Sequence, residues 1–189
     1  MPITPPPSST TPGTAKGVQA TPPLPQHLSG KSHWSYLTPT TSVLHPGVVF
    51  VSFKNENLFG DPNRDKSSLK AILPNEIKYL AGDPKSKIVF YLPQSYWNNN
   101  TEERDLATES IRYLHDELGK GGGKLVLVIT DTTPRNTAIG AGFNAAATGD
   151  EAAKIALGLA QVQIGGGLGS SGSSFQVANV SSSPGKKTP

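Results

Sequence analysis

The sequence predicts an α/β domain, a small three-layer fold built on a mainly parallel sheet. Three short and nearly continuous apolar segments have the composition of buried strands, and segments with helical spacing separate them. Strands that are buried on both faces read as continuous apolar runs, and parallel neighbours need a crossover helix between them. The alternation is therefore typical of a parallel sheet covered by helices.

The three predicted strands are rich in β-branched and aromatic residues. Segment 47–53 reads GVVFVSF, segment 87–93 reads KIVFYLP and segment 124–131 reads KLVLVITD. Such residues fit a pleated, buried surface. Pro93 closes the second strand because it has no amide N–H to continue the ladder.

Two amphipathic helices are predicted between these strands. Segment 67–83 has apolar residues at helical spacing, and Pro74 is expected to break or kink it. Segment 100–123 has the clearest pattern, with a single apolar stripe and acidic residues in its first turn. Asn100 is expected to cap this helix, and Gly119 is expected to end it.

The part of the domain after the third strand is richer in glycine and alanine. Residues 132–147 are expected to form a polar turn and a Gly-rich approach to a helix. Thr148 and Glu151 have the spacing of a capping box, so a helix is expected from there to about residue 160.

The two ends of the chain differ in composition from this domain. Residues 1–46 hold ten of the seventeen prolines and only two charged residues, so they are expected to form a Pro/Ser/Thr-rich extended arm. The α/β domain is assigned to 47–160. A Gly/Ser-rich segment over 161–180 is expected to be a hairpin, and 181–189 a disordered tail.

Aromatic residues at two places are candidates for partner binding. Trp34, Tyr36 and Leu37 form an apolar cluster inside the predicted arm, where leaving them in water would be costly. We expect this cluster to be buried against the domain or against another chain. Tyr96 and Trp97 follow the second strand, and they form either a lid over the sheet edge or an exposed contact surface.

One candidate ligand site follows the third strand. Asp131, Thr132 and Arg135 lie where parallel strands end, which is where α/β sheets bind ligands. Gly140 and Gly142 form a Gly-x-Gly like that of phosphate-binding and dinucleotide-binding loops. The alternative interpretations are a turn capped by the Asp131 side chain and close helix packing by small residues.

The sequence lacks the residues and motifs that several kinds of functional site require. The chain has no cysteine, which excludes disulfides, thiol nucleophiles and cysteine-ligated metals. Its four histidines form no pair at metal-ligand spacing, and there is no Gly-x-Ser-x-Gly motif. We therefore expect no metal site and no cofactor, and we favour a protein that is not an enzyme.

Net charge and targeting signals give little information about the partners and the localisation of the protein. The net charge is +3 and the pI about 9.1, with the basic residues scattered, so nucleic-acid binding is not expected. The chain as given shows no secretory signal and no transmembrane helix. Its localisation stays open, and the composition suggests a cell envelope or a virion.

The favoured function is a non-catalytic structural or interaction subunit of a larger multi-protein assembly, an envelope-associated or virion-type particle. Its extended termini would contact neighbouring subunits of the same or another kind. One alternative is a small-ligand-binding or anion-binding α/β enzyme domain that uses the 131–142 loop. Another is a subunit that gives the 161–180 hairpin to an oligomeric pore, although its arms are shorter than the roughly 9–11 residues that cross a bilayer. Membrane contact is expected only through the uncharged 155–185 segment, if at all.

Overall fold

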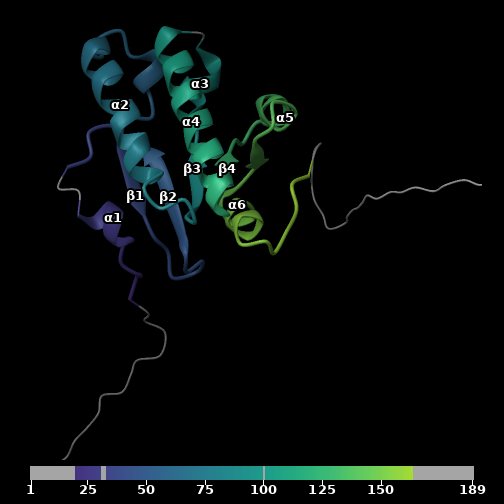
Figure 1. Ribbon diagram of the computed structural model, residues 1–189. Coiled ribbons are helices and arrows are strands. Elements are labelled where there is room, and N and C mark those ends of the chain that lie inside the picture. Colours follow the sequence, from purple (N-terminus) through teal and green to yellow (C-terminus); the bar gives the residue numbers. More distant parts are fainter. Residues whose placement is uncertain (1–19, 31–32, 100, 164–189) are drawn as a thin grey trace, which may run out of the picture.

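A computed structural model describes residues 20–30, 33–99 and 101–163 of the chain. They form an α/β domain around a five-stranded mixed sheet in the order β1-β2-β3-β4-β5 (Figure 1). β1 pairs with β2 in antiparallel fashion, and every other neighbouring pair is parallel. The strands are β1 (Leu37–Thr40), β2 (Val48–Phe53), β3 (Lys87–Tyr91), β4 (Lys124–Val128) and β5 (Asn144–Ala146).

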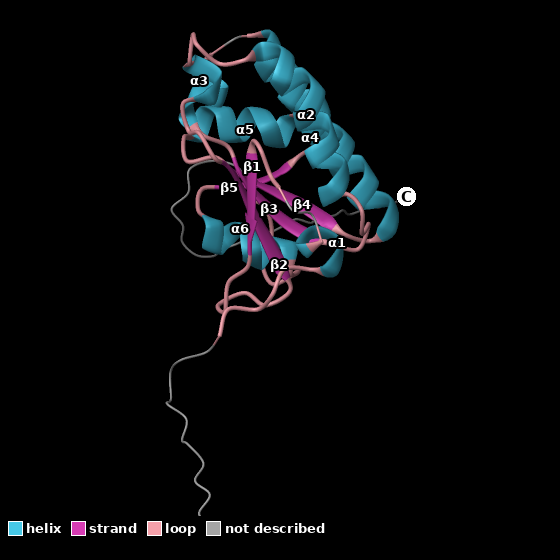
Figure 2. Cartoon of the chain, turned by 90° about the vertical axis from the view of Figure 1, so that its left-hand side faces the viewer, coloured by secondary structure: helices cyan, strands magenta, loops and turns pink. Residues whose placement is uncertain are grey.

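The helices lie on both faces of this sheet. Figure 2 shows α2 and α4 along one side of the strands and α6 on the other. The helices are α1 (Gln26–Ser29), the 3-10 helix η1 (Leu58–Gly60), α2 (Lys66–Leu80), α3 (Gln94–Asn98), α4 (Glu102–Gly121), α5 (Thr132–Gly140) and α6 (Gly149–Ala156).

The larger part of the core lies between the sheet and the helices α2 and α4. The register places Ile88 opposite both Val49 and Leu125, and all three side chains are buried in this cluster. The apolar stripes of α2 and α4 face them, because residues three and four apart share one side of a helix. Leu73 and Leu114 are the fully buried centres of these two stripes.

The ends of α4 differ from the prediction by one to three residues. Thr101 rather than Asn100 is the capping residue, and its hydroxyl accepts the N–H of Arg104 at 3.2 Å. The helix continues past Gly119 to Gly121, and Gly122, whose φ of 88° is left-handed, is its C-cap. Pro74 was expected to break or kink α2, and the helix runs through Pro74 without a break.

A smaller cluster lies on the second face, between the sheet and α6. Val89 of β3 pairs with Phe50 and Val126, and these side chains belong to this cluster. Thr148 caps α6 by accepting the N–H of Glu151 at 3.2 Å, as the capping-box pattern predicts. α6 packs on β3, β4 and β5.

The sheet has two short edge strands that the sequence pattern did not predict. β1 belongs to the sheet although its residues were assigned to the arm, and Leu28 further upstream is also buried. β5 and the helix α5 replace the expected polar turn and Gly-rich approach. These edge strands depend on pairing with β2 and β4, because their own sequences, LTPT and NAA, carry weak strand signals.

The expected hairpin and tail fall largely outside the described residues. Residues 161–163 have no regular secondary structure, and 164–189 lie beyond the described part. Residues 1–19 and 31–32 of the predicted arm also lie outside it.

Candidate functional site

The carboxyl ends of the parallel strands bring together two of the predicted sites. Asp131 directly precedes α5 and is exposed, and the indole N–H of Trp97 donates to its Oδ2 at 3.4 Å. The Asp131 side chain makes no capping hydrogen bond to α5, so the turn-capping interpretation is not what is observed. Thr132 is the first residue of the helix. Trp97 therefore covers part of the strand end where the ligand site was expected.

The two glycines of the predicted site lie at the other end of α5. Gly140 is the last residue of the helix, and Gly142 has a φ of 98° in the turn into β5. The two ends of this helix are about 12 Å apart at 1.5 Å per residue. The Gly-x-Gly leads into a strand rather than into a helix, so it lacks the helix N-terminus on which a phosphate-binding loop depends.

Arg135, a member of the predicted ligand set, lines a cavity. It is buried, and its Nη1 donates to the carbonyl oxygens of Ile129 at 2.9 Å and Thr130 at 2.8 Å. The cavity has a volume of about 130 Å³ and lies between the start of α5, the end of β5, α6 and the segment 160–163. We refer to it as the Arg135 cavity.

The aromatic cluster of the predicted arm packs on its own domain. Leu37 is fully buried in β1, and Trp34 and Tyr36 are partly buried against the main core. The carboxylate of Glu76 in α2 accepts the backbone N–H groups of Ser35, Tyr36 and Leu37, the last two at 3.0 and 3.1 Å. One buried carboxylate therefore fixes the start of β1, and the cluster packs against its own domain. Partner binding by Trp34 and Tyr36 stays a prediction.

Tyr96 is likewise a core residue rather than an exposed contact. Its ring packs edge-on against Phe59 with centroids 5.4 Å apart, and its hydroxyl forms a hydrogen bond with Thr108. Burial raises the pKa of Tyr96, although the Thr108 hydrogen bond and the charge of Arg104 oppose that shift. The neighbouring Trp97 is only partly buried, so it stays a candidate contact at the strand ends.

A surface that sequence reasoning missed lies on the second face of the sheet. We call it the open-face patch, and it consists of Leu44, His45, Phe50, Tyr91 and Asp150. These residues line a shallow cavity of about 300 Å³ between the β1–β2 loop and the start of α6. Leu44 is 78% exposed and Tyr91 37% exposed. In the sequence, this surface is indicated only by an apolar residue, Leu44, in a polar loop and by one aromatic residue in each of two predicted strands, Phe50 and Tyr91.

Polar contacts link the β1–β2 loop to α6 within this patch. His45 Nε2 lies 2.8 Å from Asp150 Oδ1, and Lys154 Nζ lies 3.0 Å from the other oxygen of Asp150. The hydrogen bonds from Lys154 and His45 hold the pKa of Asp150 below its usual value. Partial burial raises the pKa of Tyr91. A Cβ at Gly149 would lie 2.0 Å from Tyr91 Oη, so glycine is needed where the tyrosine crosses the helix start.

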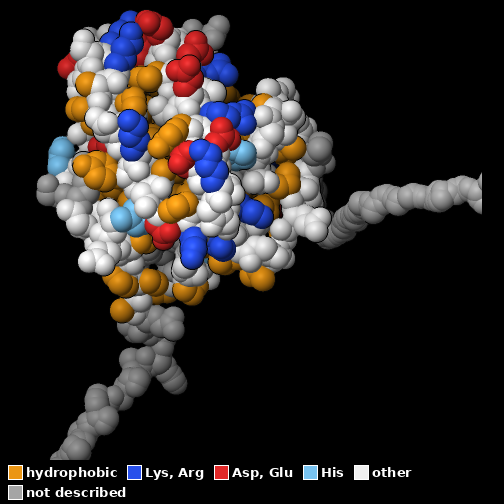
Figure 3. Space-filling view, in the orientation of Figure 1, with side chains coloured by type: hydrophobic (Ala, Val, Ile, Leu, Met, Phe, Trp, Pro, Cys, Tyr) orange, Lys and Arg blue, Asp and Glu red, His pale blue; other side chains and the backbone are white. Residues whose placement is uncertain are grey.

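The outer side of α2 and α4 shows no gathering of one sign of charge. In Figure 3, Lys and Arg side chains alternate with Asp and Glu side chains over these helices. Within residues 20–30, 33–99 and 101–163, no group of three or more His, Asp or Glu side chains could hold a metal ion. In the same part of the chain, no helix has the length and apolarity needed to cross a bilayer.

Comparison with known proteins adds no relative. No family model, no curated protein sequence and no solved structure matches the chain.

Proposed function

We propose that this protein is a non-catalytic structural or interaction subunit of a larger multi-protein assembly, and that the open-face patch is its contact surface. The observation that carries the proposal is the exposure of Leu44 beside Phe50 and Tyr91, on a sheet face that α6 covers mainly over β3, β4 and β5. A partner would complete the cover of this face.

The composition of the patch fits a protein contact. Its centre is a leucine and two aromatic rings, Phe50 and Tyr91, with centroids 6.4 Å apart. Polar residues line the same cavity, among them the His45–Asp150 pair, Thr40 and Thr41. An aromatic centre with a polar rim is the usual anatomy of an interface. Covering an exposed leucine is worth about 1.5–3 kcal/mol.

The compositions of the two chain ends support the same function. The first 46 residues are rich in proline, and 155–185 carry no charge, which is unusual for a domain that works alone. Such ends suit contacts with neighbouring subunits, of the same or another kind. An envelope-associated or virion-type particle remains the setting that we propose on composition.

The two alternative functions have less support. An enzyme site built from the whole 131–142 segment would need Asp131 and Gly142 to converge, and they lie at opposite ends of α5. The pore alternative depends on a hairpin of which all but residues 161–163 lies outside the described residues.

The proposal predicts that a charge at Leu44 weakens assembly. The test compares the native mass of the particle formed by the full-length chain with that formed by Leu44→Asp, using light scattering and native mass spectrometry. Tyr113→Asp is the matched control, because Tyr113 is 41% exposed on α4 and does not line the patch. We expect Leu44→Asp to lower the particle mass and the control to leave it unchanged. A wild-type chain that stays monomeric in native extracts, or a mass that neither variant changes, would contradict the proposal.

A further inference from the structure

Arg135 is a buried cation without a carboxylate partner. The residue is 6% exposed. The ion pairs between described residues involve other side chains, and the hydrogen-bond partners of Arg135 are two carbonyl oxygens and one hydroxyl. A buried charge is costly unless an opposite charge compensates it. The site therefore has unused capacity for an anion.

The hydrogen bonds of the guanidinium leave one of its edges available. Nη1 uses both of its N–H groups on Ile129 and Thr130, and Nη2 makes a long contact of 3.4 Å with the hydroxyl of Thr132. An arginine has five N–H donors. Within the described part of the chain, Nε–H and the second N–H of Nη2 make no hydrogen bond. These two donors lie side by side and match the two oxygens of a carboxylate.

The lining of the Arg135 cavity is partly apolar and partly polar, and its uncharged polar residues are Gln161 and Gln163. Its lining includes Ala145, Ala146, Ala147 and Ala160, with Ile155 from α6. Its volume of about 130 Å³ admits a ligand of only a few non-hydrogen atoms. The cationic edge of Arg135 beside this group of apolar side chains suits a ligand with one charged end and a short apolar body.

Two charged side chains of α6 also reach this cavity and restrict the ligand further. Lys154 adds a positive charge, although Asp150 already pairs with it at 3.0 Å. Glu151 adds a negative charge, and it is not among the ion-pair partners of any described residue. A dianion such as phosphate would be repelled by Glu151 more strongly than a monoanion. The balance of charge therefore favours a single carboxylate.

We propose that the Arg135 cavity binds a short aliphatic carboxylate. The carboxylate accepts the Nε–H and Nη2–H of Arg135, and the aliphatic part lies against Ala145–Ala147 and Ile155. This site lies apart from the open-face patch, and the inference does not depend on the proposed function.

The test is an NMR titration of the full-length, ¹⁵N-labelled protein with sodium butyrate, and separately with inorganic phosphate at the same ionic strength. We expect butyrate to shift the amide signals of Ala145–Ala147 and the Nε–H signal of Arg135 in a saturable way, and phosphate to bind at least about tenfold more weakly. An absence of saturation with butyrate would overturn the proposal. Equal or tighter binding of phosphate would overturn the carboxylate assignment.

Titrating substituted proteins with butyrate tests whether the ligand binds in the Arg135 cavity. Arg135→Gln should weaken butyrate binding by about tenfold or more, the usual effect of losing a charge-assisted hydrogen bond. Because Arg135 also supports the end of β4, Ala147→Leu serves as a second variant that fills the cavity and keeps the arginine. Arg112→Gln is the control, since Arg112 does not line this cavity. Unchanged butyrate binding in Ala147→Leu would show that the ligand binds elsewhere and would overturn the assignment.

Discussion

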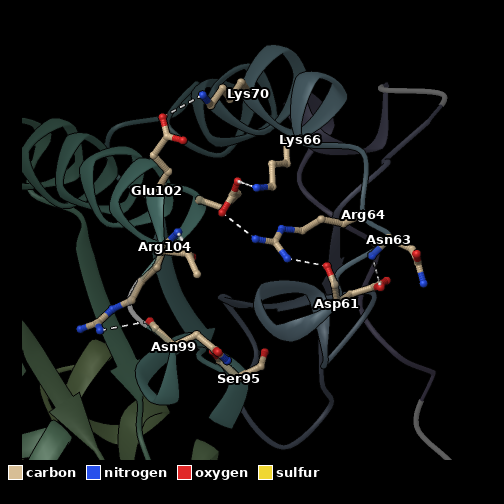
Figure 4. A network of polar contacts seen from close by, with 11 residues as sticks. Asp61, Asn63, Arg64, Lys66, Lys70, Ser95, Asn99, Glu102 and Arg104 are labelled. Carbon is tan, nitrogen blue, oxygen red and sulfur yellow. Dashed lines mark hydrogen bonds and ion pairs between the residues drawn. The ribbon is translucent and has the colours of Figure 1, made fainter.

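At the scale of single residues, two buried glutamates are stabilised in different ways. Glu76 and Glu103 are each 1% exposed. Glu76 is surrounded by backbone amides and fixes β1 to α2. Glu103 receives Arg64 Nη2 at 2.6 Å, with Lys66 Nζ at 3.7 Å. Figure 4 shows Arg64 reaching from the segment before α2 toward the start of α4.

The lowered pKa of Glu103 predicts that the protein loses stability at acidic pH. Burial alone would raise the pKa of its carboxyl, but the hydrogen bond and the charge of Arg64, with a backbone N–H and Lys66, lower the pKa overall. A carboxyl whose pKa is lower in the folded state stabilises that state above its unfolded pKa, about 4.3 for glutamate. This contribution is lost as the pH falls through the folded pKa.

The measurement is the free energy of unfolding in urea between pH 7 and pH 3 for the wild type and Glu103→Gln. The wild type should lose stability on acidification more steeply than the variant. Glu109→Gln, at an exposed position of α4, should follow the wild type. Parallel pH profiles for the wild type and Glu103→Gln would contradict the prediction.

At the scale of elements, the contact between α2 and α4 organises the larger core. Both helices present apolar residues at three- and four-residue spacing, and these residues pack against the sheet as well as against each other. Leu114 is fully buried near the middle of α4, whereas the adjacent Tyr113 is 41% exposed.

Leu114→Ala should lower the free energy of unfolding by about 2–5 kcal/mol, because it removes buried methyl groups and leaves a cavity. Tyr113→Ala, one residue away on the exposed side of α4, should have a smaller effect. Chemical denaturation of both variants under the same conditions gives the comparison. A change for Leu114→Ala within the measurement error would mean that this position does not face the core in solution.

At the scale of the whole molecule, the question is where the folded unit begins. Composition puts the start near residue 47, whereas the structure includes β1 and the buried Leu28. The edge strand is attached by its ladder to β2 and by the carboxylate of Glu76. It should therefore unfold with the domain rather than separately.

Hydrogen exchange tests this extent of the fold. The amides of Tyr36 and Leu37 should be protected in the wild type to a degree similar to the amides of β2. Glu76→Ala should remove that protection while β3 and β4 stay protected, because the buried N–H groups lose their acceptor. Glu109→Ala is the exposed control. Rapid exchange of the Leu37 amide in the wild type would mean that the folded unit begins near residue 47, as composition predicts.

The sequence by itself determined the central part of this fold. The strands β2, β3 and β4 and the helices α2 and α4 lie where hydrophobic periodicity predicts them. Their side chains are strongly apolar and regularly spaced, so local pattern and tertiary burial agree. The capping box at Thr148 predicts the start of α6 for the same reason, since its hydrogen bond is local.

Only the tertiary structure decided the edges of the sheet and the candidate sites. β1 is a strand because it pairs with β2 and because the carboxylate of the distant Glu76 accepts its first N–H group, and β5 is a strand because it pairs with β4. Such partners cannot be read from local composition. The open-face patch joins a loop, two strands and a helix that are more than a hundred residues apart in the chain. The sequence pointed to Arg135, but its lack of a counterion depends on which carboxylates fold near it, and that is a property of packing alone.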